Sequence, residues 1–124
     1  MIDVNPSEIT ITSLDEQLVF KAISFVEEHL SDIDLSVETL SSAVGLTRGH
    51  LYKKLISITG KTPSEFIKII RLKRAKQLLA DSQMQVSEIA YSVGFNSPKI
   101  FAKHFRSEFG MSPSEYVKSL KDFS

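Results

Sequence analysis

The chain carries one pattern twice, and this repeat constrains the fold more than any other feature of its 124 residues. Residues 37–46, VETLSSAVGL, align with 86–95, VSEIAYSVGF, and residues 51–68 align with 101–118, with one extra residue in the second connection. Such internal self-similarity is typical of a supersecondary unit that occurs more than once. The glycines and prolines follow the same repeat, namely Gly45 with Gly94, Gly60 with Gly110 and Pro63 with Pro113.

The first copy is predicted to hold two helices separated by a short turn. Ser36 is expected to start a short helix that ends at Gly45, because glycine often turns the chain left-handed past a helix end. Thr47 is expected to cap the next helix, which ends before Gly60. Two helices joined by a tight, glycine-containing turn describe a helix-turn-helix.

The second copy has equivalent turn and capping residues. Ser87 follows the connecting segment, Gly94 makes the turn, and Asn96 or Ser97 caps a helix that runs to about Gly110. One such pair of helices could equally be an ordinary helical hairpin. Two pairs with the same turn and capping residues favour two helix-turn-helix units.

Residues 63–81, PSEFIKIIRLKRAKQLLAD, are predicted to form one long helix that joins the copies. Its apolar residues recur at helical spacing over more than one stripe, so we expect it to be buried on two sides. At about 1.5 Å per residue, it rises roughly 25 Å between residues 64 and 80. Arg71 could pair with a carboxylate and so fix the packing. The other basic residues are expected mostly to face solvent: Lys68, Lys73, Arg74 and Lys76.

A further helix is predicted ahead of the repeat, over residues 14–31. Ser13 can cap it, and Glu16 three residues later completes a capping box. Its acidic residues are expected to face water. Its apolar stripe consists of Leu14, Leu18, Ala22, Phe25, Val26 and Leu30.

These elements predict an all-α chain in which two helix-turn-helix subdomains are joined by a long connector helix. Residues 1–13 lack periodicity and are expected to form a linker or disordered arm. The remaining divisions are 14–62 for the first helix and first helix-turn-helix, 63–81 for the connector, and 82–124 for the second helix-turn-helix and a C-terminal helix.

The formal net charge of zero hides a strong asymmetry along the chain. Up to residue 40, nine acids accompany one base, whereas from residue 41 onward fourteen bases accompany six acids, so the net charge changes from −8 to +8. A basic body of this kind suggests a polyanionic partner, although the surface lysines of an ordinary helical domain would give part of the same count.

Several function classes lack support in the sequence. The absence of cysteine excludes disulfides, thiolate metal sites and a cysteine nucleophile. No phosphate-binding loop, paired metal-ligand spacing or nucleophile motif is found, so we expect no cofactor, no metal and no catalysis. His29 and His104 are expected at the surface or core edge rather than as ligands. The lack of a long apolar run or signal-peptide pattern favours a cytoplasmic location without membrane contact.

The second helix of each copy has an apolar inner face. Leu51, Leu55 and Ile58 share this face in the first copy, and Phe101 and Phe105 do so in the second. On or beside the outer face of the first copy lie Arg48, Gly49, His50, Tyr52, Lys53 and Ile56. Those of the second copy are Pro98, Lys99, Ile100, Ala102, Lys103 and Arg106.

These outer faces suit the major groove of DNA. Neither carries an acid before Glu108, and Lys53 and Lys103 are repeat equivalents. A recognition helix places such residues on base edges, where Arg and Lys donate to guanine O6 and N7. A connector of roughly 25 Å could carry the two helices to successive grooves, about 34 Å apart, if the helix bodies supply the difference or the DNA bends.

From about residue 18 to 121 the sequence resembles the DNA-binding domain of the AraC/XylS family of bacterial transcription regulators. The matching residues are Glu88-Ile89-Ala90, Val93-Gly94-Phe95, Phe101, Phe105-Arg106, Phe109-Gly110, Ser112-Pro113 and Tyr116, with Arg71-Leu72, Ala75 and Leu78-Leu79 in the connector. The resemblance implies about seven helices and sequence-specific promoter binding. Its base-contacting positions correspond to Arg48, Gly49, Tyr52, Lys53, Pro98, Lys99 and Lys103.

The first copy departs from the family pattern. Leu55-Ile56-Ser57 stands where the family often has Phe-Lys-Lys, so two cations are missing, and Gly49 offers no side chain. We therefore hypothesise that the second copy supplies much of the phosphate affinity, or that Ile56 meets another protein. Residues 96–99 and the polar arm ahead of the first helix further resemble the C-terminal output module of hybrid two-component sensors.

The sequence thus predicts a sequence-specific, double-stranded DNA-binding output domain that binds a promoter operator. The expected contacts are Arg48, Gly49, His50, Tyr52, Lys53, Asn96, Ser97, Pro98, Lys99, Lys103 and Arg106. RNA polymerase is a possible partner, and we expect a tethered sensor or dimerisation domain outside this chain. The alternative is a protein-interaction module in which the acidic first helix, or Ile56 and Tyr52, docks a sensor domain or polymerase.

Overall fold

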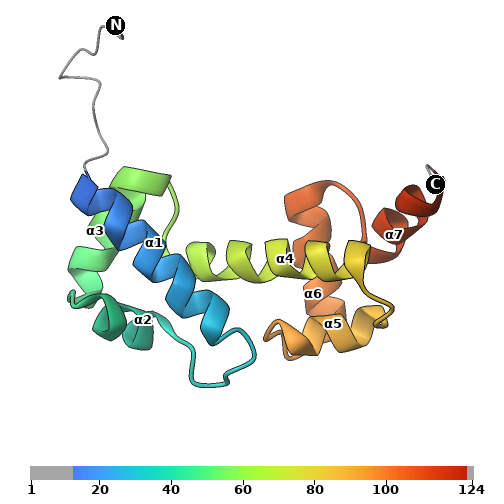
Figure 1. Ribbon diagram of the computed structural model, residues 1–124, viewed down its shortest axis with the longest axis horizontal. Helices are drawn as coiled ribbons and strands as arrows, with labels where there is room; N and C mark the ends of the chain where they lie inside the picture. The colour runs from blue at the N-terminus through green and yellow to red at the C-terminus, as the bar shows by residue number, and fades with distance from the viewer. Residues whose placement is uncertain (1–12, 123–124) are drawn as a thin grey trace, which may run out of the picture. The chain divides into compact units, whose positions relative to one another are not determined.

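The computed structural model describes residues 13–122, in which seven α-helices and no strand are found (Figure 1). The helices are α1 Ser13–Glu28, α2 Val37–Val44, α3 Arg48–Thr59, α4 Pro63–Asp81, α5 Val86–Ser92, α6 Pro98–Phe109 and α7 Pro113–Asp122. The predicted all-α class and the two helix-turn-helix pairs, α2–α3 and α5–α6, are confirmed. The expected N-terminal arm lies outside the described residues, except for Ser13, which begins α1. No helix of residues 13–122 is long and apolar enough to cross a membrane.

The described chain divides into two compact units. The first comprises residues 13–28 and 34–67, and the second comprises residues 29–33 and 68–122. Helix α4 is continuous, and it contributes its residues up to Ile67 to the first unit and those from Lys68 to the second (Figure 1). The loop 29–33 packs with the second unit, which the sequence pattern did not indicate.

Capping residues define the first helix-turn-helix. Ser36 accepts a hydrogen bond from the Thr39 N–H at 3.2 Å, and the Ser36 N–H donates to Thr39 Oγ1 at 2.9 Å. Gly45 ends α2 in the left-handed region with φ of 75°, and Thr47 caps α3 by accepting from the His50 N–H at 3.1 Å. The predicted starts and ends of both helices are confirmed.

The second helix-turn-helix uses different caps. Ser87 lies inside α5. The N-cap of this helix is Gln85, whose N–H donates to Glu88 Oε1 at 3.3 Å. For α6 the cap is Ser97 rather than Asn96, because the Ser97 hydroxyl accepts from the Ile100 N–H at 3.2 Å. The sequence had left these two residues as alternatives.

The core of the first unit is aliphatic. Helices α1, α2 and α3 pack against one another, and α4 adds Phe66 and Ile67. The side chains fully excluded from solvent are Ala22, Val26, Leu40, Leu51 and Leu55. Burial of these residues removes apolar area from water, which is the main favourable term in folding.

Two expectations for α1 were wrong. Its acids do not all face water, because Asp15 is buried and its carboxylate accepts from Lys54 Nζ of α3 at 3.2 Å. A buried carboxylate requires such a partner, and Lys54 supplies it. Leu14, in the first turn of α1, is 74% exposed, so the buried apolar stripe begins further along the helix.

The core of the second unit is rich in aromatic rings. Phe101 and Phe105 are fully buried against Leu72, Ala75 and Leu79 of α4. The ring centroid of Phe105 lies 5.7 Å from that of Phe101, 4.7 Å from that of Phe109 and 6.0 Å from that of Tyr116. Lys76 Nζ lies 4.6 Å from the Phe109 ring centroid. Of the four basic residues of α4 expected mostly to face solvent, Lys73 is exposed, whereas Lys68, Arg74 and Lys76 are half-buried.

The turn of the second helix-turn-helix is tightly packed at Gly94. Gly94 has φ of 98°, and a Cβ atom there would lie 2.1 Å from the Leu30 carbonyl oxygen and 2.7 Å from Arg71 Nε. This Nε is buried without a hydrogen-bond partner, so the carboxylate pairing predicted for Arg71 is not formed at this atom. Burial lowers the pKa of the Arg71 guanidinium. Arg71 packs against the Gly94 turn instead.

Candidate nucleic-acid interface

Helix α3 presents the predicted first interface. Leu51 and Leu55 anchor its inner face in the core of the first unit and thereby fix which side of the helix faces solvent. The predicted contact residues Arg48, Gly49, His50, Tyr52 and Lys53 are all exposed. The structure therefore brings these five residues together over the first two turns of one helix.

A hollow lies beside the N-terminal end of α3. It encloses about 530 Å³ and is lined by Val37, Arg48, Gly49, Tyr52, Thr62, Pro63 and Ser64. Apart from the adjoining residues and backbone of α3 itself, no atom lies within 4 Å of the place where a Cβ of Gly49 would stand. Gly49 is therefore not required by packing within the chain, and its lack of a side chain leaves this part of the surface open. The sequence did not reveal this hollow because its walls come from three separate helices.

Helix α6 presents the predicted second interface. Phe101 and Phe105 anchor its inner face in the second unit, and Lys99, Lys103 and Arg106 are exposed on the other side. Asn96 is also exposed, ahead of the helix. Ser97 and Pro98 are half-buried, and the Ser97 hydroxyl is engaged as the helix cap.

Acidic residues from neighbouring helices approach both interfaces. Glu38 of α2 accepts a hydrogen bond from Arg48 Nη1 at 2.7 Å, and Glu115 of α7 lies 3.4 Å from Arg106 Nη1. Both acids lie on helices other than α3 and α6, so the residue pattern of the recognition helices does not reveal either pair. Both are exposed, and such pairs contribute little to stability.

Glu115 has a second role at the start of α7. Its carboxylate accepts from the Ser112 N–H at 2.9 Å, and its own N–H donates to the Ser112 hydroxyl at 3.1 Å. The pKa of Glu115 is lowered first by the backbone hydrogen bond from Ser112, then by the Ser112 side chain, and also by the nearby Arg106. Glu115 is therefore ionised and serves as a helix cap as well as a partner of Arg106.

His104 lies on α6 beside the predicted contacts. Its ring centroid is 6.2 Å from that of Phe95. Burial lowers the pKa of His104, and the positive charges of Lys68 and Lys103 lower it further. The imidazole is therefore neutral near pH 7 and adds no charge to this surface. Within residues 13–122, no group of three or more His, Cys, Asp or Glu side chains could hold a metal ion.

Comparison with known proteins gives consistent matches over most of the chain. A family model described as a helix-turn-helix domain matches residues 40–119. Histidine kinase P4 of Formosa agariphila is 46% identical over 113 residues, which are 91% of this chain and 8% of that protein. Three further curated relatives are matched over 34%, 37% and 32% of their lengths. The chain therefore spans only a minor part of the curated relatives that it matches.

Solved structures with a similar fold include two that cover nearly the whole described chain. One is a transcriptional regulator from Chromobacterium violaceum described by its AraC-type DNA-binding domain, with a TM-score of 0.80 at 26% identity over 88% of this chain and 96% of that one. The other is the DNA-binding domain of AdpA, solved in complex with a target DNA, with a TM-score of 0.74 at 30% identity over 90% and 96%.

Proposed function

Because this chain belongs to the AraC/XylS family of helix-turn-helix domains of transcription regulators, we propose that it binds promoter DNA through helices α3 and α6. Domains of this family bind double-stranded DNA in transcription regulation. The proposal therefore concerns which residues make the contacts and how affinity and sequence preference are divided among them.

In the first unit the proposed contacts are Arg48, Gly49, His50, Tyr52 and Lys53. All five are exposed near the N-terminal end of α3, which is the end that a recognition helix directs towards base edges. The open surface at Gly49 allows a base or sugar to approach the helix backbone closely.

In the second unit the proposed contacts are Asn96, Lys99, Lys103 and Arg106, which are exposed, together with Ser97 and Pro98. Because the Ser97 hydroxyl caps α6 and Pro98 begins the helix, we infer that these two residues act mainly by shaping the approach to the DNA. Their direct contacts would then be made by backbone and apolar atoms.

The observation that carries the proposal is the shared position of two exposed lysines. Lys53 and Lys103 are repeat equivalents, and each stands on an outer face whose inner side is anchored in a separate core. Affinity should come mainly from phosphate contacts, and site preference from the residues that reach base edges.

The proposed partners outside this chain are a sensor or dimerisation domain and RNA polymerase. The relative from Formosa agariphila supports the first, since this chain matches only 8% of that protein. The kinase activity in that relative's name is not assigned to this chain. Weak binding by the isolated domain would then be strengthened by tethering to a second copy. Promoter binding in bacteria implies a cytoplasmic location, which we infer from the proposed role.

The experiment that tests the proposal is selection of duplexes from a random library with the purified domain. The most enriched duplex is then titrated with the domain at two salt concentrations. We expect a motif with two short blocks about one helical turn apart, with affinity that falls steeply as salt rises. Enrichment of one block would assign base recognition to one unit only. No enrichment, with equal binding to all sequences, would contradict the proposal.

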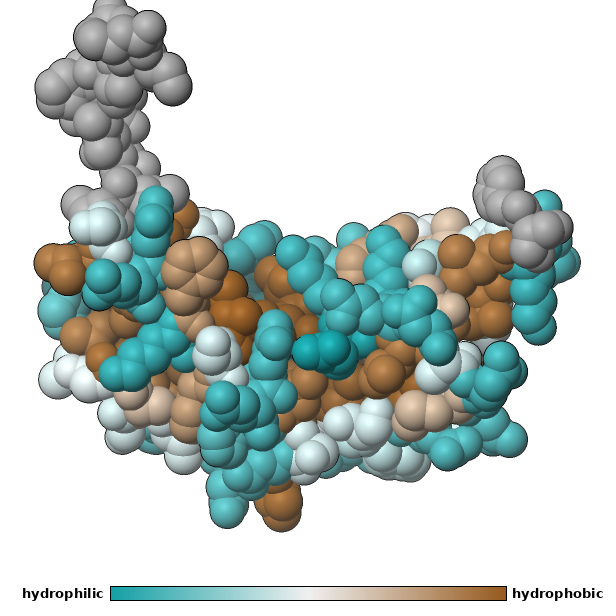
Figure 2. Space-filling view, in the orientation of Figure 1, coloured by the Kyte–Doolittle hydropathy of each residue, from teal (hydrophilic) through white to brown (hydrophobic). Residues whose placement is uncertain are grey.

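One observation favours an additional protein-binding role for α1. Phe20 is 66% exposed on this helix, and hydrophobic residues reach the surface in the region of α1 (Figure 2). An apolar contact would persist in high salt, whereas binding to DNA phosphates would weaken. Retention of a partner protein at high salt, and its loss in a Phe20→Ser variant, would support this second role beside DNA binding.

A further inference from the structure

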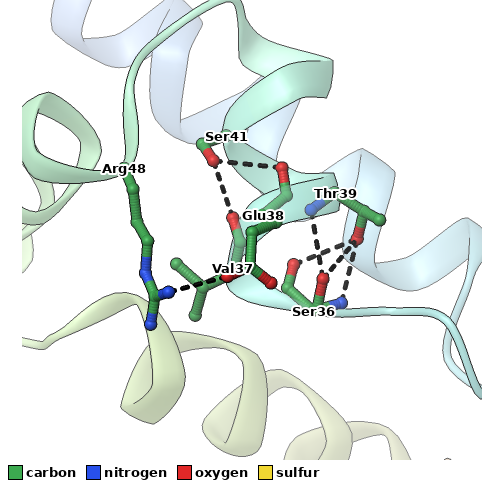
Figure 3. Close-up of polar contacts among 6 residues, drawn as sticks. All are labelled: Ser36, Val37, Glu38, Thr39, Ser41 and Arg48. Atoms are coloured by element: carbon green, nitrogen blue, oxygen red, sulfur yellow. Dashed lines mark hydrogen bonds and ion pairs between the residues drawn. The ribbon is translucent and has the colours of Figure 1, made fainter.

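The first turn of α2 holds an acidic residue in a fixed position beside α3. Reciprocal hydrogen bonds between Ser36 and Thr39 cap α2, and the Ser41 hydroxyl donates to the Val37 carbonyl at 2.8 Å (Figure 3). These bonds fix the backbone on both sides of Glu38. A carboxylate is also favoured at this end of a helix by the helix dipole.

Glu38 contacts the first residue of the recognition helix. Its Oε1 accepts from Arg48 Nη1 at 2.7 Å, and Figure 3 shows the two side chains meeting between α2 and the start of α3. The backbone at Arg48 is fixed in turn by the Thr47 cap. The pair therefore joins two well-defined helix ends and restricts the directions that the Arg48 side chain can take.

Stability does not explain this pair. Both side chains are 67% exposed, and exposed ion pairs contribute little to the free energy of unfolding. An acid at a DNA interface also repels phosphates, so Glu38 should weaken binding to every sequence. An ion pair that adds little stability, and whose acid opposes affinity, is better explained by an effect on recognition.

The geometry leaves Arg48 free to recognise a base while it is held. Arginine has five N–H donors, and the bond to Glu38 uses one nitrogen, so the remaining donors can still reach an acceptor pair. Arg48 also borders the hollow beside Gly49 and Tyr52, where a base edge has room to approach. Guanine presents O6 and N7 in the geometry that arginine binds best.

The second unit has no acid–arginine pair at the positions equivalent to Glu38 and Arg48, and its own pair, Arg106 with Glu115, lies further along α6. The repeat places Ser87 opposite Glu38 and Pro98 opposite Arg48, so neither the acid nor the arginine is present there. A change at Glu38 should consequently alter recognition by the first unit alone, which makes the effect separable.

We propose that Glu38 is a positioning residue that orients Arg48 for one guanine of the operator, giving discrimination at that base at the expense of overall affinity. This inference rests on the proposed function of α3 as a DNA-recognition helix. It adds a residue outside the recognition helix to those that determine the site.

The test compares Glu38→Gln with the unchanged chain on duplexes that differ at one base pair. The Arg48→Ala variant first identifies the position that Arg48 discriminates. We expect Glu38→Gln to bind a scrambled duplex more tightly, and to lose about threefold or more of the discrimination at that position, which is part of what a bidentate arginine contact supplies. In the Arg48→Ala background, Glu38→Gln should change discrimination no further, because Glu38 affects discrimination only through the Arg48 side chain.

A matched control separates positioning from net charge. Glu16→Gln removes an exposed acid from α1 of the same unit and should leave the discrimination unchanged. If the unchanged chain prefers a sequence but Glu38→Gln keeps full discrimination, or Glu16→Gln loses as much, the inference is overturned and the proposed function stands. If the unchanged chain shows no base preference at all, the proposed function fails, and this inference fails with it.

Discussion

The two helix-turn-helix units share their turn glycines and lysine positions but differ in their helix caps, in their cores and in the surroundings of the recognition helix. The first unit buries aliphatic side chains such as Leu55, and its recognition helix begins with an arginine held by Glu38. The second unit buries a cluster of rings around Phe105 and leaves the predicted contact Lys103 exposed. The comparison shows that the two copies keep the same order of helices and turns. Their core side chains and the residues around their recognition helices differ.

The largest expected effect is on the core of the second unit. Phe105 and Leu55 are repeat equivalents, and both are fully buried. Phe105→Ala should lower the free energy of unfolding by about 3 to 5 kcal/mol, and Leu55→Ala by about 2 to 5 kcal/mol. Phe105 adds edge and tilted contacts with three other rings, which Leu55 cannot make.

Urea unfolding followed by circular dichroism would measure both core variants. Ile100→Ala, at a 51% exposed position of α6, is the control and should change stability by no more than about 0.5 kcal/mol. A loss of less than about 1 kcal/mol in Phe105→Ala would contradict the packing of this ring cluster.

The next comparison concerns the equivalent turn glycines. Both Gly45 and Gly94 have positive φ, so an alanine at either costs about 1 to 2 kcal/mol. A Cβ at Gly45 would meet nothing within 4 Å, whereas one at Gly94 would overlap the Leu30 carbonyl oxygen. The backbone shift forced at Gly94 should add roughly 1 to 3 kcal/mol. Equal melting-temperature losses in Gly45→Ala and Gly94→Ala would show that this close approach is absent in solution.

The third comparison concerns DNA affinity at equivalent lysines. Lys103→Ala should weaken the preferred duplex by about 1 to 3 kcal/mol and relax one base position, as expected for a side chain that contacts a base edge. Lys53→Ala is its matched variant in the first unit. Titrations on the selected duplex and on single-base variants would measure both. An equal loss on all sequences would identify Lys103 as a phosphate contact.

The fourth comparison concerns the outer faces of α3 and α6 about one helical turn after these lysines. The repeat places Ile56 opposite Arg106, and Ile56 is 39% exposed. If this position lies near phosphates, Ile56→Lys should tighten binding and steepen the dependence of log affinity on log salt by about 0.9. An unchanged affinity and salt slope would place Ile56 away from the DNA and favour a protein contact. Ser57→Lys, at the neighbouring exposed position, tests how local the effect is.

Much of the fold could be predicted because its signals are local in sequence. Thr47, Gly60 and Pro63 mark helix ends through their own backbone preferences, and the spacing of Leu51 and Leu55 gives the inner face of α3. Because that inner face is packed in the core, the predicted contacts on the other side of α3 are exposed.

The features that escaped prediction depend on residues distant in sequence. Asp15 is buried because Lys54, on another helix, neutralises it, and Glu38 reaches Arg48 across the turn. Arg71 packs against Gly94 because the chain after α1 also lies there. Periodicity describes one helix at a time, so it cannot show which partner a charged residue will find on the next.

The smallest expected effect is a pH dependence that should belong to the second unit. The repeat places His104 opposite Lys54, whose Nζ lies 3.2 Å from Asp15 Oδ1. At His104, burial and then Lys68 and Lys103 lower the pKa, so the fold favours the neutral ring. The unfolded chain therefore binds a proton at this imidazole more readily than the folded chain does. The contribution of the neutral ring to the free energy of unfolding is complete above the ordinary pKa of 6.5, and it is lost as the pH falls through the lowered pKa of the folded state.

The melting temperature of the unchanged chain should therefore fall more between pH 7 and pH 5 than that of His104→Gln. His50→Gln, at an exposed position of α3, is the control and should retain the full dependence. Because other groups titrate over the same range, the difference between variants carries the result rather than either curve alone. An identical pH dependence in all three proteins would mean that the basic surroundings of α6 do not disfavour a charged His104. The replacement of Lys54 by His104 in the second copy would then add no pH dependence to the stability of that unit.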